Sequence, residues 1–136
     1  MRVFLDANFL VAAGLVPDGD YRRVLSLQVD TYVTSEHIIS EVTRNLERLR
    51  RSPSEYIAYL RSLMEVTDQF ELLPVGTPLE GSGDRQALAE AIGAECELFV
   101  TSDTDFSALF GTRIRGVLVE KSALYARRVL ESRVNE

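Results

Sequence analysis

The chain of 136 residues is 46% hydrophobic and 26% charged, and its formal net charge is −6. This composition predicts one compact domain over residues 1–136. It argues against a disordered chain, a coiled coil and a general nucleic-acid coat, whose affinity depends on net positive charge. No apolar run reaches the roughly 18 residues of a membrane-spanning helix, and no signal-peptide pattern opens the sequence, so we expect a cytoplasmic protein with no membrane partner.

Short apolar runs and amphipathic stretches alternate along the sequence, which predicts alternating strands and helices. The expected elements are, in chain order, a strand at Arg2–Leu5, a helix at Phe9–Leu15, a helix from Tyr21, a strand at Tyr32–Thr34, a helix after Ser35, a helix from Pro53, a strand at Phe70–Leu73, a loop at Pro74–Gly83, a helix from Asp84 to Gly93, strands at Leu98–Val100 and Val117–Val119, and a helix from Ser122. This order predicts a three-layer α/β/α fold with a mainly parallel central sheet.

Capping signals set the expected starts of the helices. Asp20, after a Pro-Asp-Gly turn, is expected to cap the second helix and Ser35 the third. Ser52, with Pro53 and Glu55 behind it, fits a capping box for the fourth. The inward positions are expected at Ile38, Val42, Leu46 and Leu49, at Ile57, Leu60 and Leu63 or Met64, at Ala87, Leu88, Ala91 and Ile92, and at Leu124, Val129 and Leu130.

Acidic residues stand where the predicted strands end and where helices begin. Asp6 and the pair Asp103 and Asp105 follow strands directly, at the sheet edge where open parallel sheets bind ligands. Glu41 and Asp84 lie early in helices, and helices that follow parallel strands begin at that same edge. Carboxylates brought together repel one another, and a divalent cation is the simplest compensation.

The metal expected there is Mg²⁺ or Mn²⁺. One cysteine and one histidine are too few for the usual zinc sites, so any ion would be held by oxygen atoms, which these two cations prefer. An ion in such a site can activate water and stabilise an anionic leaving oxygen, and hydrolysis of phosphodiester bonds is the chemistry that this serves best.

Four pieces of the sequence, in their order, resemble the PIN-domain ribonucleases. They are Leu5-Asp6-Ala7-Asn8, Ser40-Glu41-Val42, Asp84-Arg85 at the head of an alanine-rich helix, and Val100-Thr101-Ser102-Asp103-Thr104-Asp105-Phe106 after a strand. Each piece is weak alone, but the set spans nearly the whole chain. Its compact spacing is most similar to the toxin components of toxin-antitoxin pairs, the VapC-like group. One departure is Leu79–Gly83, which lacks the extra acids often found there in these relatives.

The resemblance implies a PIN-like fold, Mg²⁺ or Mn²⁺ dependence and cleavage of RNA. It also implies a homodimer and inhibition by a cognate antitoxin protein. Carried over by residue, it implies that Asp6, Glu41, Asp84 and Asp103 are the catalytic and metal-binding acids, and that Asn8, Thr101 and Asp105 support them. The division of roles between Asp103 and Asp105 is left open, with Asp103 as the first choice.

Arginines gather locally although the chain as a whole is acidic. Arg44, Arg48 and Arg51 lie on the helix of Glu41 or just beyond it. Such a cluster is usually a solvated helix face. As a hypothesis, these three side chains, together with Arg85, guide the RNA backbone toward the metal.

Two other functions fit parts of the pattern. A phosphoacceptor receiver domain also has acids at strand ends and a lysine after its last strand, where Lys121 stands, but Tyr32–Ser35 offers no aspartate to accept phosphate. A PIN-like module that binds RNA or protein without cutting stays open as the alternative. His37 is interpreted as a surface or helix-start residue, because no nucleophile is placed to use it as a base, and Cys96 as a packed residue.

Overall fold

The computed structural model describes residues 1–134. Its elements are, in chain order, β1 (Arg2–Leu5), α1 (Ala7–Leu15), α2 (Asp20–Leu27), β2 (Thr31–Ser35), α3 (Glu36–Arg48), α4 (Ser54–Leu63), β3 (Glu65–Thr67), α5 (Ser82–Gly93), β4 (Leu98–Thr101), the 3-10 helix η1 (Thr104–Phe106), β5 (Arg113–Ile114), β6 (Val117–Lys121) and α6 (Ser122–Val134). The strands form a six-stranded sheet in the order β3-β2-β1-β4-β6-β5. All neighbours pair in parallel except β5 and β6.

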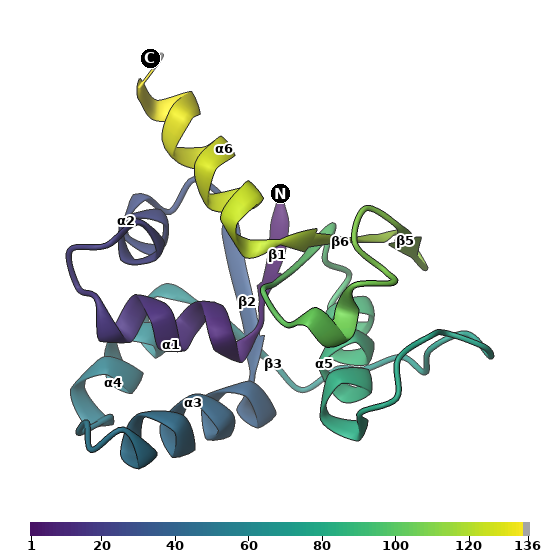
Figure 1. The fold of residues 1–136 in the computed structure, drawn as a ribbon, viewed down its shortest axis with the longest axis horizontal. Helices are drawn as coiled ribbons and strands as arrows, with labels where there is room; N and C mark the ends of the chain where they lie inside the picture. Colours follow the sequence, from purple (N-terminus) through teal and green to yellow (C-terminus); the bar gives the residue numbers. More distant parts are fainter. Residues whose placement is uncertain (135–136) are drawn as a thin grey trace.

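Helices cover both faces of this sheet (Figure 1). From β1 to β3 the chain steps toward one edge, and right-handed crossovers place α1 to α4 on one face. Helix α5 leads back from β3 to β4 on the other face, and Figure 1 shows α1, α2 and α4 on one side of the central strands and α5 on the other. The predicted three-layer α/β/α fold with a mainly parallel sheet is confirmed. No helix within residues 1–134 is long and apolar enough to cross a membrane.

Three neighbouring aromatic rings join the central strands to the segment that follows β4. The ring centroids of Phe4 in β1 and Phe99 in β4 lie 5.6 Å apart, and those of Phe99 and Phe106 lie 5.0 Å apart. All three side chains are fully buried, and burying a side chain of this size stabilises a fold by about 1.5–3 kcal/mol. Phe106 therefore anchors η1 against the core, close to the end of β4.

The register of the two central strands brings their ends together. Leu5 of β1 pairs with Val100 of β4, and the backbone N–H of Asp6 still donates to the Val100 carbonyl, at 3.0 Å. Asp6 and Thr101, the next residue along β4, consequently lie side by side at the carboxyl edge of the sheet.

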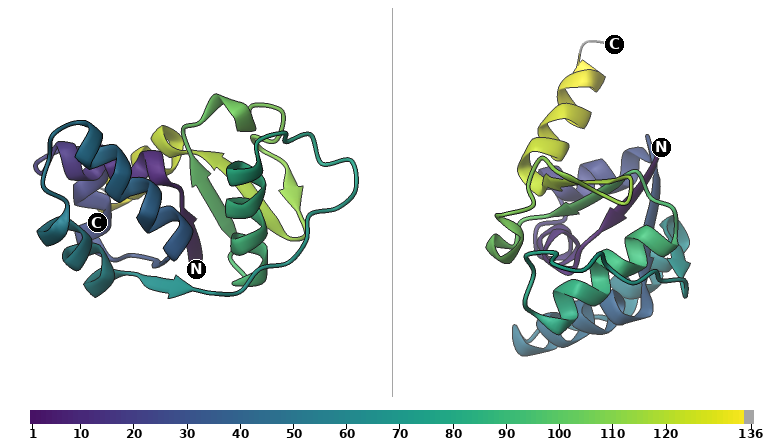
Figure 2. Two further views of the ribbon diagram at one scale, coloured as in Figure 1. Left: turned by 90° about the horizontal axis from the view of Figure 1, so that it is seen from below. Right: turned by 90° about the vertical axis from the view of Figure 1, so that its right-hand side faces the viewer.

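The strand predicted at Phe70–Leu73 is wrong, because the edge strand is the earlier and shorter β3. Phe70 and Leu72 are 68% and 77% exposed. Their segment crosses α5 by backbone contact: the N–H of Glu71 donates to the Ala89 carbonyl at 2.9 Å, and a Cβ atom on Gly93 would overlap the backbone of Phe70. The loop that continues from this segment bulges outward before α5 begins (Figure 2).

The helix caps are partly as predicted. Ser35 caps α3, and its hydroxyl accepts a backbone N–H of the first turn at 3.2 Å. Asp20 is instead the first residue of α2, which is capped by Gly19, and α4 is capped by Pro53 with no side-chain hydrogen bond, so that the capping box predicted from Ser52 does not form.

Two positions expected in the core are exposed. Leu49 and Leu124 are 52% and 50% exposed. Helix α3 ends at Arg48, so Leu49 falls where the chain leaves the helical stripe. The two-residue strand β5 was not predicted, because its pairing with β6 rests on a tight turn and not on an apolar run of its own.

Candidate functional site

Asp6 leaves the end of β1, caps α1 and is only 6% exposed. Its Oδ1 accepts the backbone N–H of Ala7 at 2.9 Å, and its Oδ2 accepts the hydroxyl of Thr101 at 2.7 Å. Burial raises the pKa of Asp6 to about 6, although these hydrogen bonds lower it, and the negative charges of Glu41 and Asp103 raise it further. The carboxyl group is therefore fixed in position but poorly compensated in charge.

A network around Thr101 fixes the segment that follows β4. Its Oγ1 accepts the side-chain amide of Asn8 at 3.2 Å and the backbone N–H of Asp103 at 3.1 Å. The Oδ1 of Asn8 accepts the N–H of Ser102 at 3.2 Å. Asp103 in turn caps η1, since its Oδ1 accepts the N–H of Asp105 at 2.9 Å. One hydroxyl thus links the ends of β1 and β4.

Asp84 reaches the same place from the first turn of α5. Its carboxylate lies over Gly81, where an added Cβ would come 2.8 Å from Oδ2. Burial raises the pKa of Asp84 to about 6, and the negative charges of Asp103, Asp105 and Asp6 raise it further. One carboxylate oxygen from each of Asp84, Asp103 and Asp105 lies within 4.8 Å of the others, a spacing at which the three can hold a cation.

The four acids that the sequence singled out line one pocket of about 350 Å³, together with Asn8 and Asn45 and apolar side chains of α1. The acids are Asp6, Glu41, Asp84 and Asp103. They come from the end of β1, from α3, from α5 and from the turn after β4. The tightest group of carboxylates is a different set, which contains Asp105 in place of Asp6 and Glu41. Asp84 and Asp103 belong to both sets and mark the centre of the site.

His37 lies at the start of α3, one of the two placements expected for it, but its side chain is not on the open surface. Its side chain is 19% exposed, and its Nε2 lies 3.0 Å from Oε1 of Glu41. The spacing of four residues on one helix was a signal for this contact. Its Nδ1 lies 3.5 Å from Oε1 of Glu90, a buried acid of α5 that the sequence did not single out. No local pattern marks Glu90, since its hydrogen-bond partner Ser35 is 55 residues away along the chain.

The arginines expected to guide RNA fall into two groups. Arg44, Arg48 and Arg51 are exposed, and Arg48 donates to Oδ1 of Asn45, a residue of the pocket lining, at 3.3 Å. Arg85 instead donates to backbone carbonyls of the loop before α5, at 2.8 and 3.3 Å. Its guanidinium holds this loop.

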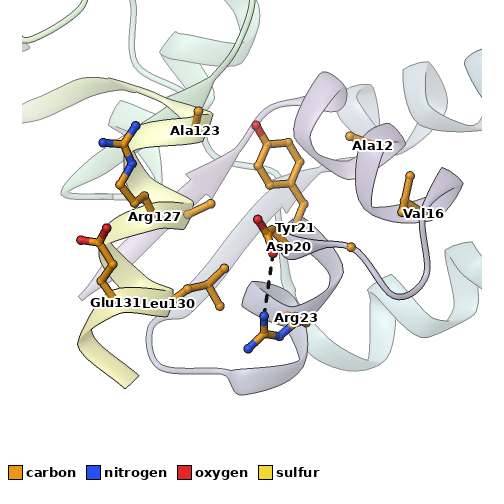
Figure 3. A pocket seen from close by; sticks show the side chains of 11 residues that line it. Ala12, Val16, Asp20, Tyr21, Arg23, Ala123, Arg127, Leu130 and Glu131 are labelled. Atoms are coloured by element: carbon orange, nitrogen blue, oxygen red, sulfur yellow. Dashed lines mark ion pairs between the residues drawn. The ribbon is translucent and has the colours of Figure 1, made fainter. Parts of the chain in front are cut away.

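A second, larger hollow of about 730 Å³ lies between α1, α2 and α6 (Figure 3). Ala12 of α1 lines both hollows. Apolar side chains such as Val16 and Leu130 face this second hollow, and Asp20 and Arg23 form an ion pair of 3.8 Å at its side.

No protein-family model matches the sequence, and no curated protein matches it. Solved structures do match the fold. VapBC2 from Rickettsia felis, solved bound to a DNA fragment from its promoter, superposes with a TM-score of 0.64 at 17% identity over 89% of this chain and 98% of that one. VapC20 of Mycobacterium tuberculosis, a toxin that cleaves the sarcin-ricin loop, gives a TM-score of 0.58 at 20% identity over 78% and 93%.

The chain has the PIN-like fold of these toxins. This confirms the fold that the sequence resemblance implied. The structure also argues against a receiver domain. The ammonium of Lys121 lies 5.4 Å from the centroid of the Phe110 ring, and Lys121 is not among the described residues that line the acidic pocket.

Proposed function

We propose that the chain is a metal-dependent endoribonuclease that acts as the toxin of a toxin-antitoxin pair. The observation that carries the proposal is the pocket lined by Asp6, Glu41, Asp84 and Asp103, which four separate elements supply. The likeness to VapC20, a toxin that cleaves the sarcin-ricin loop, supports RNA as the substrate class.

The donor atoms of the pocket suit Mg²⁺ or Mn²⁺. Oxygen ligands of an octahedral Mg²⁺ lie about 2.9 Å apart when adjacent and about 4.2 Å apart when opposite. The carboxylate oxygens of Asp84, Asp103 and Asp105 lie within 4.8 Å of one another, so they would move closer together to bind one ion directly. Burial is the main cause of the raised pKa of Asp6 and of Asp84, and neighbouring acids add to it, so a bound cation would favour the charged form of both carboxylates.

Asp6, Glu41, Asp84 and Asp103 would hold the ion. The chemistry that such an ion supplies is activation of water and stabilisation of charge on the scissile phosphate. The chain's own part is to keep the carboxylates in place: Thr101, which accepts a hydrogen bond from Asn8, donates to Asp6, and the N–H of Asp105 donates to Asp103. With water as the nucleophile and the 3′-oxygen as the leaving group, the products carry 5′-phosphate and 3′-hydroxyl ends.

Cleavage of a single-stranded RNA in Mn²⁺ tests the proposal. We expect Asp6→Asn and Asp103→Asn to lower the rate by about 100-fold, because each removes a charged ligand. Asp18→Asn, an exposed acid outside the pocket, is the matched control and should cut like the wild type. A chelator should abolish cleavage.

Equal cleavage by the wild type and Asp6→Asn would assign the activity to a contaminant. A wild type that binds RNA but does not cut it would support the non-catalytic module instead. Cyclic phosphate ends would contradict water as the nucleophile, because they form when the 2′-oxygen of the RNA attacks.

We also propose that the chain is a homodimer and binds a cognate antitoxin. The structural neighbour VapBC2 supports the antitoxin, since it was solved as a complex on promoter DNA. Light scattering on the purified chain gives its oligomeric state. Co-expression with the product of a short reading frame next to its gene tests the partner, which should co-purify with the chain and block RNA cleavage.

A further inference from the structure

His37 stands between the acidic pocket and a buried acid of α5. Its Nε2 lies 3.0 Å from Oε1 of Glu41, which lines the pocket, and its Nδ1 lies 3.5 Å from Oε1 of Glu90. One imidazole ring therefore has a carboxylate at each nitrogen. These two carboxylates belong to different helices, α3 and α5.

Glu90 is itself held in place. It is 8% exposed, and its Oε1 accepts the hydroxyl of Ser35 at 2.8 Å. Ser35 is fully buried at the end of β2, and the same hydroxyl accepts the N–H of Ile38 in the first turn of α3. A buried carboxylate with a fixed hydrogen-bond donor cannot move without a cost of about 1–3 kcal/mol. Glu90 thus gives the ring of His37 a rigid neighbour.

The backbone of α5 closes the third side of the contact. A Cβ atom on Gly83 would lie 3.4 Å from Oε1 of Glu41 and 3.7 Å from Nε2 of His37. Gly83 therefore lets the helix start approach the pair closely. Asp84, which also lines the pocket, is the next residue of the chain.

We propose that His37 is a positioning residue for Glu41. In this role Nε2 of His37, 3.0 Å from Oε1 of Glu41, holds this carboxylate at the pocket. Glu90 lies beside the other nitrogen of the ring, 3.5 Å from Nδ1, which has no hydrogen-bond partner within residues 1–134. The inference rests on the proposed function, because the position of Glu41 matters only when the pocket binds an ion. Partners that hydrogen-bond a ligating carboxylate typically contribute about 10- to 100-fold to metal affinity.

Calorimetric titration of Mn²⁺ into the RNA-free protein tests this without any activity measurement. We expect His37→Ala to weaken Mn²⁺ binding by about 10-fold. His37→Gln should bind more tightly than His37→Ala, because its side-chain amide can donate to Glu41 from nearly the same place. Glu90→Gln should also weaken Mn²⁺ binding. It keeps an oxygen that accepts the Ser35 hydroxyl, but it replaces the charged carboxylate beside the His37 ring by a neutral amide.

Glu36→Gln is the matched control for charge. Glu36 lies in the first turn of the same helix and pairs with Arg61 on the surface. The Glu36→Gln variant should leave the Mn²⁺ affinity unchanged. Thermal unfolding of each variant without metal separates a positioning role from a structural one, because a purely structural residue lowers the melting temperature but leaves the ion affinity of the folded protein intact.

The outcomes distinguish the two proposals. Absence of Mn²⁺ binding by the wild type overturns the proposed function and the role of His37 with it. Binding by the wild type with unchanged affinity in His37→Ala overturns the role of His37 alone. A tenfold loss that His37→Gln partly restores supports the role.

A spectroscopic readout covers the case in which His37→Ala does not fold. His37 is the only histidine of the chain, so its imidazole NMR signals are unambiguous. In the wild type they should shift when Mg²⁺ is added, and in Glu41→Gln this shift should be lost. If the wild type binds Mn²⁺ but the imidazole signals of His37 do not shift when Mg²⁺ is added, the proposed contact is overturned.

Discussion

At the scale of single residues, two carboxyl groups of the pocket stand out by their protonation. The pKa of Asp6 and that of Asp84 are each raised from 3.8 to about 6 in the ion-free protein. Burial is the main cause at both residues, and neighbouring acids add to it. Between about pH 4 and pH 6, the folded chain therefore binds protons that the unfolded chain has released.

This sets the sign of a pH dependence. The stability that these two protonated groups contribute is fully present below about pH 4 and is lost as the pH rises through about 6. In a chelator, we expect the melting temperature of the wild type to fall relative to that of Asp84→Asn across this range. Differential scanning calorimetry from about pH 4 to about pH 7.5 measures both proteins, with Asp18→Asn as the control. If the difference in melting temperature between the wild type and Asp84→Asn did not change with pH, the raised pKa of Asp84 would be contradicted.

At the scale of elements, α5 carries Asp84 at one end and meets an irregular segment at the other. Gly93, the last residue of α5, lies against the backbone of Phe70. The hydrogen bond from Glu71 to the carbonyl of Ala89 holds the same segment to the helix. Backbone atoms cannot rotate out of the way as a side chain can, so this approach depends on the missing side chain of Gly93.

Gly93→Ala should therefore destabilise the fold by about 2 kcal/mol, as overpacking of a close contact typically does. The usual gain of about 1 kcal/mol from replacing a helical glycine should not appear. Urea unfolding measures the change, and Gln86→Ala, at an exposed position of the same helix, should change stability by less than about 0.5 kcal/mol. A stabilised Gly93→Ala would mean that the Phe70 segment does not pack there.

At the scale of the whole molecule, the net charge of −6 opposes binding of a polyanion. Arg44, Arg48 and Arg51 form an exposed basic surface on and after α3. Arg48 borders the pocket through its contact with Asn45. Local charge of this kind can orient a phosphate backbone even on an acidic protein.

Replacement of these three arginines by glutamine should weaken RNA binding and flatten its dependence on salt. The logarithm of the affinity falls with the logarithm of the salt concentration, and each lost phosphate contact reduces the steepness of this fall by about 0.7 for a single strand. Three lost contacts therefore reduce it by about 2. Fluorescence anisotropy with a labelled RNA gives the slope, in an Asp103→Asn background that is expected not to cut. A double replacement of Arg23 and Arg127, which line the second hollow, is the control. An unchanged slope in the triple variant would exclude this surface from RNA binding.

The sequence predicted most of the elements and the acids of the pocket, because their signals are local. Apolar runs mark β1, β4 and β6, and Ser35 marks the start of α3. The strand expected at Phe70–Leu73 failed because an apolar run does not reveal whether a neighbouring strand is free to pair with it. Here β3 already occupies the edge beside β2.

The amino-acid sequence by itself determined most of the strands and helices and placed Asp6 and Asp103 at or just after strand ends. Hydrophobic periodicity and the chemistry of caps act over a few residues, and these features depend on nothing more. Only the tertiary structure decided that His37 faces Glu90, and that Asp105 joins Asp84 and Asp103. Such contacts follow from the packing of α3, α5 and β4, which bring together side chains that are far apart along the chain.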